Sequence, residues 1–118
     1  MHLLPLLLLT LGCEPPPQPG TGVAQASASR GRLAIERVGF ASWHTIGGIA
    51  WPRGKAGPAL AGLDRRGLIA GRLPNRPDIL AAFVRDAPGL VPGTTMPAMP
   101  LTEREAADVA AYLYAIGR

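Results

Sequence analysis

The sequence predicts an all-α domain in which three main helices are joined by long loops rich in glycine and proline. Three segments repeat apolar residues three and four positions apart, which is the period of an amphipathic helix. No segment shows the alternation of apolar and polar residues that predicts a strand. The chain has 118 residues, of which 47% are apolar and 17% charged. This length allows one domain, and this composition excludes both a disordered acidic segment and a coiled coil.

The first two helices are expected over residues 31–42 and 77–87. In each segment, apolar side chains recur at helical spacing. The second helix opens with Pro77, because the fixed backbone angle of proline suits a first helical turn. Pro88 is expected to stop it.

The third helix is expected to follow Thr102 and to run to about residue 116. Thr102 and Glu105 form a capping box, in which the hydroxyl and the carboxylate each accept a free backbone N–H. Gly117 is the expected stop. One face of this helix carries the apolar residues Ala106, Val109, Ala110, Leu113 and Ile116.

The remaining chain is expected to form two long loops, over residues 47–75 and 87–100, with a short helical turn around 60–66. Loops of this length in a small domain need something to wrap around. The chain has only two residues each of Phe, Trp and Tyr, a thin supply of large side chains for a core. Together these features favour a bound cofactor.

The N-terminal part of the chain predicts export. The apolar run at residues 3–11 is far shorter than a membrane span, so residues 1–12 are expected to be a signal peptide of the lipoprotein type. The run ends at Cys13 in a sequence that resembles a bacterial lipobox, which predicts Cys13 as the lipidation site; the alternative is an ordinary signal peptide cut nearby. Residues 13–29 then form a proline-rich tether, and residues 30–118 the folded domain. We expect a periplasmic protein anchored in the membrane by its lipid.

Charge and motifs exclude several functions. The formal net charge is +4, but the basic residues form no block of about five or more, which argues against a nucleic-acid-binding arm. The single cysteine allows no intramolecular disulfide and would give a zinc site at most one thiolate. The glycine-rich loop follows no predicted strand and lacks the Gly-Lys-Ser/Thr ending of a phosphate-binding loop. We therefore expect neither a hydrolase nor a nucleotide-dependent enzyme.

Short motifs follow one another in an informative order along residues 31–116. In chain order they are His44-Thr45-Ile46-Gly47-Gly48, Gly57-Pro58-Ala59-Leu60, Arg65-Arg66 through Ile69-Ala70-Gly71, Leu73-Pro74-Asn75, Gly93-Thr94-Thr95-Met96-Pro97 and Ala110-Ala111-Tyr112-Leu113-Tyr114. This order resembles that of the class I cytochrome c domain in small bacterial c-type cytochromes. The resemblance implies a cytochrome c-like fold.

The resemblance also implies an iron site formed by His44 and Met96. His44 would be the proximal ligand of a haem iron and Met96 the distal one, and the Pro58 carbonyl would hold the other ring nitrogen of His44. Arg66 would lie near a haem propionate. An imidazole and a thioether give six-coordinate, low-spin iron that exchanges one electron. The expected function is one-electron transfer to a redox protein without substrate turnover, and the basic surface favours an acidic partner.

The chain departs from this family at the haem-attachment motif. Where the family has two cysteines, this chain has Phe40 and Trp43, so covalent attachment of haem is excluded. In the main interpretation, haem is bound non-covalently, and these two side chains pack against the porphyrin edge in place of the missing bonds.

Two alternatives remain open at this point. In the first, haem has been lost, Phe40 and Trp43 fill the cavity, and the domain is a lipid-tethered binding or scaffold module. In the second, His44, Met96 and Met99 bind Cu(I), for which imidazole and thioether are suitable ligands.

Overall fold

The structure is a computed structural model that describes residues 26–50 and 52–116. These residues form α2 (Ala28–Val38), η1 (Phe40–Ser42), η2 (Leu63–Arg65), β1 (Leu68–Ile69), β2 (Leu73–Pro74), α3 (Pro77–Arg85), α4 (Ala87–Leu90) and α5 (Glu103–Ala115), where η denotes a 3₁₀ helix. The predicted signal peptide, the Cys13 lipidation site and most of the predicted tether lie outside the described residues. No helix within the described ranges combines the length and the apolar character that crossing a membrane requires.

The prediction of an all-α fold with three main helices is wrong. β1 and β2 form a small antiparallel sheet, with Ile69 opposite Leu73, so the architecture is mixed α/β. The turn between the strands holds Ala70 and Gly71 at φ values of 52° and 68°. Each strand has only two residues, too few for an alternating pattern to be recognised in the sequence. A fourth helix, α4, also stands in the segment expected to be loop.

The first helix is displaced toward the N-terminus from its expected range. It begins at Ala28, where the Ser27 hydroxyl accepts the Arg30 N–H at 3.3 Å. It ends at Gly39, which has a φ of 72° and provides the left-handed C-cap that favours glycine. The chain then continues as η1, so the single helix expected over residues 31–42 is two elements.

The second helix also ends earlier than expected. α3 stops at Arg85, and the Asp86 carboxylate accepts the Gly89 N–H at 3.2 Å, which caps α4. Pro88 therefore lies in the first turn of α4, where its missing N–H costs no helical hydrogen bond.

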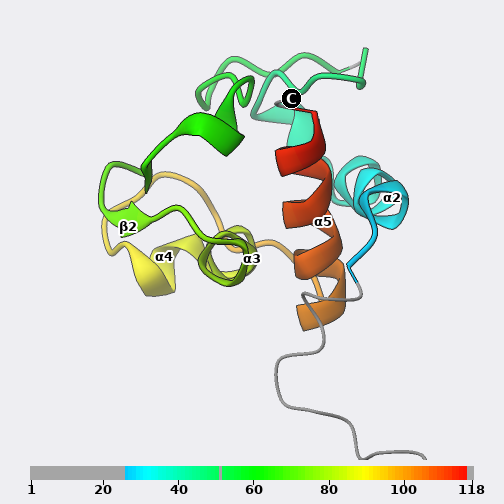
Figure 1. The fold of residues 1–118 in the computed structure, drawn as a ribbon. Coiled ribbons are helices and arrows are strands. Elements are labelled where there is room, and N and C mark those ends of the chain that lie inside the picture. Colours follow the sequence, from blue (N-terminus) through cyan, green and yellow to red (C-terminus); the bar gives the residue numbers. More distant parts are fainter. Residues whose placement is uncertain (1–25, 51, 117–118) are drawn as a thin grey trace, which may run out of the picture.

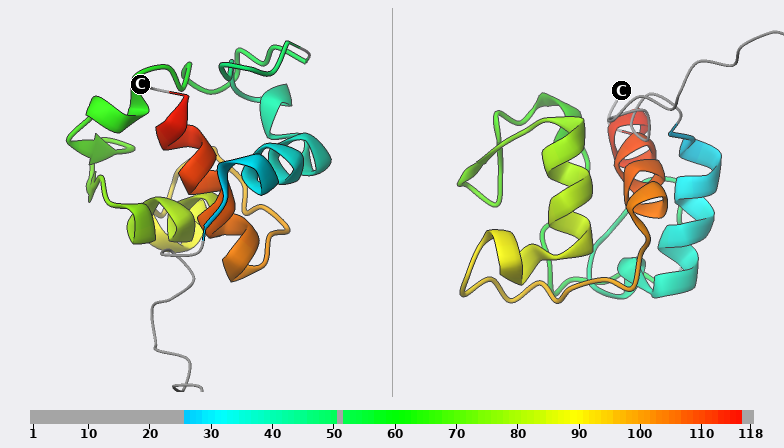
Figure 2. Two further views of the ribbon diagram at one scale, coloured as in Figure 1. Left: turned by 45° about the vertical axis from the view of Figure 1, so that its right-hand side comes forward. Right: turned by 90° about the horizontal axis from the view of Figure 1, so that it is seen from below.

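The last helix, α5, lies between α2 and α3 and packs against both (Figures 1 and 2). Its predicted capping box is confirmed, with the Thr102 hydroxyl accepting the Glu105 N–H at 3.1 Å and the Glu105 carboxylate accepting the Thr102 N–H at 2.8 Å. Gly31 allows the close approach of α2, because a Cβ there would overlap the backbone carbonyl of Asp108. The largest fully buried side chains are Phe40, Ile35, Leu113, Val84 and Val109.

A buried carboxylate paired with a partly exposed arginine fixes the start of α2 on α5. The Asp108 carboxylate, in a residue only 3% exposed, accepts the Ser27 N–H at 2.7 Å and two Arg30 guanidinium N–H groups at 2.8 and 2.9 Å. Burial raises the pKa of Asp108, but the hydrogen bonds from Arg30 and Ser27 outweigh burial and hold that pKa below its usual value. The first residues of the fold are therefore anchored by an ionised carboxylate.

Candidate functional site

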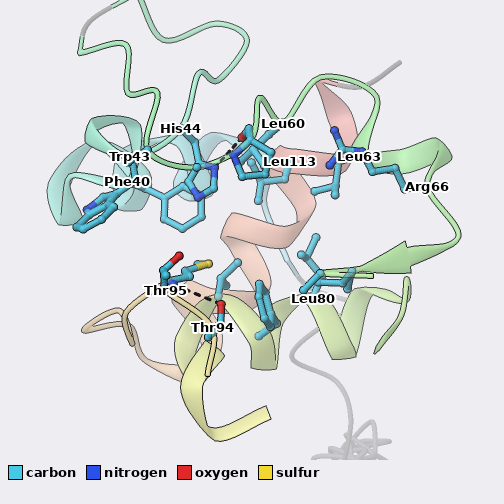
Figure 3. Close-up of a pocket in the computed structure, with 18 of the residues that line it drawn as sticks. Phe40, Trp43, His44, Leu60, Leu63, Arg66, Leu80, Thr94, Thr95 and Leu113 are labelled. Atoms are coloured by element: carbon cyan, nitrogen blue, oxygen red, sulfur yellow. Dashed lines mark hydrogen bonds between the residues drawn. The ribbon is translucent and has the colours of Figure 1, made fainter. Parts of the chain in front are cut away.

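A cavity of about 480 Å³ lies between the 3₁₀ helices, the small sheet, α3, α5 and the loop that follows α4. This volume is within the range typical of ligand and cofactor sites. In Figure 3, Phe40, Trp43 and His44 form one wall, and Thr94 and Thr95 lie across from them. Most of the remaining wall is aliphatic or aromatic, from Leu60, Leu63, Leu68, Ile69, Leu80, Phe83, Val84 and Leu113.

His44 is the buried titratable side chain of this cavity. Only 6% of it is exposed, and its Nδ1 lies 2.8 Å from the Pro58 carbonyl oxygen, the contact that the resemblance implied. A carbonyl can only accept, so Nδ1 carries the proton and Nε2 keeps its lone pair in the neutral ring. Within the described part of the chain, the ring of His44 makes its hydrogen bond through Nδ1, and Nε2 has no partner. An imidazole in this tautomer is ready to coordinate a metal through Nε2.

Gly57 leaves room for this imidazole because it has no side chain. A Cβ at Gly57 would lie 2.5 Å from Nδ1 and 2.8 Å from Nε2 of His44 and would overlap Cε1 as well. The Gly57 N–H donates to the Trp43 carbonyl at 2.7 Å, so the loop is also tied to the end of η1. Gly57 opens the Gly-Pro-Ala-Leu motif, whose sequence alone did not indicate this role.

Phe40 and Trp43, which stand in place of the expected cysteines, contribute differently to the wall. Phe40 is only 2% exposed and stacks on the His44 ring, with centroids 5.0 Å apart and planes 25° from parallel. Trp43 lines the cavity but is 42% exposed, so it lies at the rim. Neither side chain closes the cavity.

Met96 approaches the cavity from the loop between α4 and α5. Its side chain is half-buried, lines the cavity and packs on the hydrophobic core. Its N–H donates to the Thr94 hydroxyl at 3.3 Å, and the Thr94 N–H in turn donates to the Val91 carbonyl at 3.1 Å. Thr94 therefore shapes the turn that presents Met96, a role that the sequence analysis did not assign.

Arg66 lies on the rim. It is exposed, lines the cavity, and donates to the Ala59 carbonyl at 2.9 Å and more weakly to the Ala61 carbonyl at 3.5 Å. Its guanidinium thus braces the loop after Pro58 and also places a positive charge at the cavity mouth.

Asn75 joins this rim to α5. Its side-chain amide donates to the Leu63 and Arg66 carbonyls, both at 2.7 Å, and its carbonyl accepts the Tyr114 hydroxyl at 2.5 Å. Burial and the nearby Asp78 charge raise the pKa of Tyr114, which keeps the hydroxyl protonated as a donor. The Leu-Pro-Asn motif had marked Asn75 without showing this link.

The structure brings the predicted cofactor-binding residues to one cavity: Phe40, Trp43, His44, Pro58, Arg66 and Met96. Met99 is the exception among the ligands considered, because it is buried in the core at 7% exposure and does not line the cavity. The described residues contain no group of three or more His, Cys, Asp or Glu side chains placed to hold a metal ion. Metal chemistry at this site would therefore rest on the imidazole and the thioether.

Comparison with known proteins gives one partial similarity. No family model matches the chain. Over 87 residues the chain is 36% identical to cytochrome c oxidase subunit 2 of Alkalihalophilus pseudofirmus, a match that covers 73% of this chain and 25% of that protein. The chain thus matches about a quarter of the length of this relative.

Proposed function

We propose that the cavity binds one haem non-covalently, with His44 and Met96 as iron ligands, and that the domain carries single electrons. The observation that carries this proposal is the His44 imidazole, whose Nδ1 is bound to the Pro58 carbonyl and whose Nε2 is left without a partner in a cavity that Met96 also lines. The proposal places the chain among class I cytochrome c relatives that lack the attachment cysteines.

The residues present suit such a group in size and in chemistry. A largely apolar cavity of about 480 Å³ with one imidazole and one thioether would suit a large, mostly apolar cofactor whose iron takes these two groups as ligands. When bound, haem supplies a one-electron couple, whose potential a thioether ligand raises. The similarity to a cytochrome c oxidase subunit supports a role in electron transfer.

Each side chain has a definite part in this proposal. Pro58 fixes the tautomer and the direction of the His44 ring, and Phe40 keeps that ring from turning by stacking on it. Trp43 lines the rim with part of its indole in solvent, where it would pack against a bound haem. Arg66 offers its positive charge to a carboxylate at the cavity mouth.

The cavity argues against the interpretation in which Phe40 and Trp43 have replaced haem. Trp43 is 42% exposed rather than folded inward, and the cavity is still about 480 Å³. The copper interpretation is also disfavoured, because it needs Met99 beside His44, and Met99 belongs to the core.

The ligand assignment is tested by comparing two methionines in the full chain reconstituted with hemin. Met96→Leu preserves volume but removes the thioether, so the low-spin six-coordinate spectrum should become five-coordinate or water-ligated. Met99→Leu is the matched control and should leave the spectrum unchanged. An unchanged spectrum in Met96→Leu, or the same change in both variants, would remove Met96 from the site.

A further inference from the structure

Both ends of the loop that carries Met96 are held at one residue, Arg85. The loop leaves α3 immediately after Arg85, passes through α4 and returns before α5. On its return, the Met99 N–H donates to the Arg85 carbonyl at 3.1 Å, and the Arg85 Nε–H donates to the Leu101 carbonyl at 3.1 Å. Both closing contacts of the loop therefore belong to the last residue of α3.

These two contacts differ in what they require. Any residue at position 85 would offer the backbone carbonyl to Met99, whereas the bond to the Leu101 carbonyl needs the guanidinium. Leu101 is itself only 6% exposed and immediately precedes the N-cap of α5. The side chain of Arg85 thus joins the end of α3 to the start of α5.

A second contact of the same guanidinium serves as an internal comparison. Arg85 also pairs with Glu103 at 3.2 Å, but the Glu103 side chain is 90% exposed. Exposed ion pairs contribute little, because solvent screens the charges and holding two long side chains costs entropy. The partly buried bond to Leu101 is therefore the one expected to hold the loop.

Met96 depends on this closure because its backbone is held within the loop, while only its half-buried side chain packs on the core. It lies outside any helix or strand, and its N–H is held within the loop by Thr94 rather than by a neighbouring element. If residues 99–101 were released from Arg85, the turn at Thr94 would move together with Met96, and the thioether would leave the cavity wall.

We propose that Arg85 is a positioning residue that closes the methionine loop, defined as residues 86–101, and thereby holds Met96 at the cavity. The part that concerns iron ligation rests on the proposed function. Closure of the loop by Arg85 does not depend on haem, so loop closure and iron ligation can be measured separately.

The experiment compares three variants with the full-length wild type after reconstitution with hemin. Arg85→Met keeps an unbranched side chain and its helix propensity but removes the donors. Arg85→Lys restores one charged donor, and Glu103→Gln removes only the exposed ion pair. Azide binds the ferric iron only when Met96 has left it, so its apparent affinity reports the population of the open loop. Loss of a hydrogen bond from a charged donor should raise azide affinity at least about tenfold in Arg85→Met. Glu103→Gln should stay within about twofold of wild type, and Arg85→Lys should lie between Arg85→Met and wild type.

The same variants without hemin give the second readout. Opening of the loop exposes the Met99 N–H, so its hydrogen exchange should be about tenfold faster in Arg85→Met and unchanged in Glu103→Gln. Equal azide affinity in wild type and Arg85→Met, or an equal rise in Glu103→Gln, would overturn the inference even if hemin binds as proposed. If hemin does not bind to the wild type, the proposed function has failed, and the Met99 exchange rate alone decides the closure, with an unchanged rate in Arg85→Met overturning it.

Discussion

Adding one methyl group at Gly57 should damage the site, because the group would occupy space held by the His44 ring. The new Cβ would lie 2.5 Å from Nδ1, and the ring, which is 6% exposed and stacked on Phe40, could yield only by moving away from Pro58 toward the cavity. The φ of Gly57 lies outside the left-handed region, so alanine itself fits the backbone there. The cost of Gly57→Ala is therefore the displacement of the imidazole.

The magnitude follows from what this displacement breaks. Losing the hydrogen bond between Nδ1 and the Pro58 carbonyl lowers the free energy of unfolding by about 1 kcal/mol. Forcing the ring off its rotamer costs about 1 kcal/mol more. A loss of about 2 kcal/mol should lower Tm by roughly 10 °C in a domain of this size. Hemin affinity should fall as well, because Nε2 no longer points where the Pro58 contact directs it.

The assay is thermal unfolding followed by circular dichroism, with Gly67→Ala as the matched control. A Cβ at Gly67 meets nothing within 4 Å, so this variant should be neutral or gain up to about 1 kcal/mol by restricting the unfolded chain. In a His44→Ala background the penalty of Gly57→Ala should shrink to less than about 0.5 kcal/mol. Equal Tm values for Gly57→Ala and Gly67→Ala, or an unchanged penalty without the imidazole, would refute the reasoning.

Three further predictions concern the fold, the missing cysteines and the N-terminus. Asp108 has a folded pKa below its unfolded value of 3.8, so its contribution to stability is complete above that pH and is lost as pH falls through the folded pKa. Asp108→Asn should cost about 1 to 3 kcal/mol at neutral pH and flatten the acid side of the stability curve. Asp78→Asn, in an exposed pair, should cost much less, and equal losses in urea titrations would contradict this. Replacing Phe40 and Trp43 by cysteine in a host that matures c-type cytochromes should give covalently bound haem, and a haem-free product on a haem-stained gel would count against the register. Cys13→Ser should move the protein from the membrane fraction to the soluble fraction, and an unchanged fractionation pattern would mean that the anchor is elsewhere or absent.

Much of the site was accessible from the sequence because its residues belong to local motifs. The resemblance carried by the motifs around His44, Pro58 and Met96 implied that these residues share a site. The structure brings them to one cavity and contains the implied contact between His44 and the Pro58 carbonyl. The capping box of α5 was equally predictable, since both of its partners, Thr102 and Glu105, lie within one helical turn.

The sequence analysis missed elements that are very short and contacts that join residues far apart in the sequence. The two-residue strands are too short to produce a period, and their turn requires a positive φ at Ala70, a residue that gives no turn signal. The link from Arg85 to Leu101 joins residues 16 positions apart, at the ends of two helices that were predicted separately. Such contacts depend on how α3 and α5 meet, which helical periodicity does not specify.

The central claim is tested most directly by an optical titration of the purified full chain with hemin, followed by dithionite reduction. We expect a saturable one-to-one shift of the Soret band and sharp low-spin α and β bands on reduction, both lost in His44→Ala. The Gly67→Ala variant should titrate like the wild type. A folded chain that leaves the hemin spectrum unchanged, or a shift that persists in His44→Ala, would contradict the account.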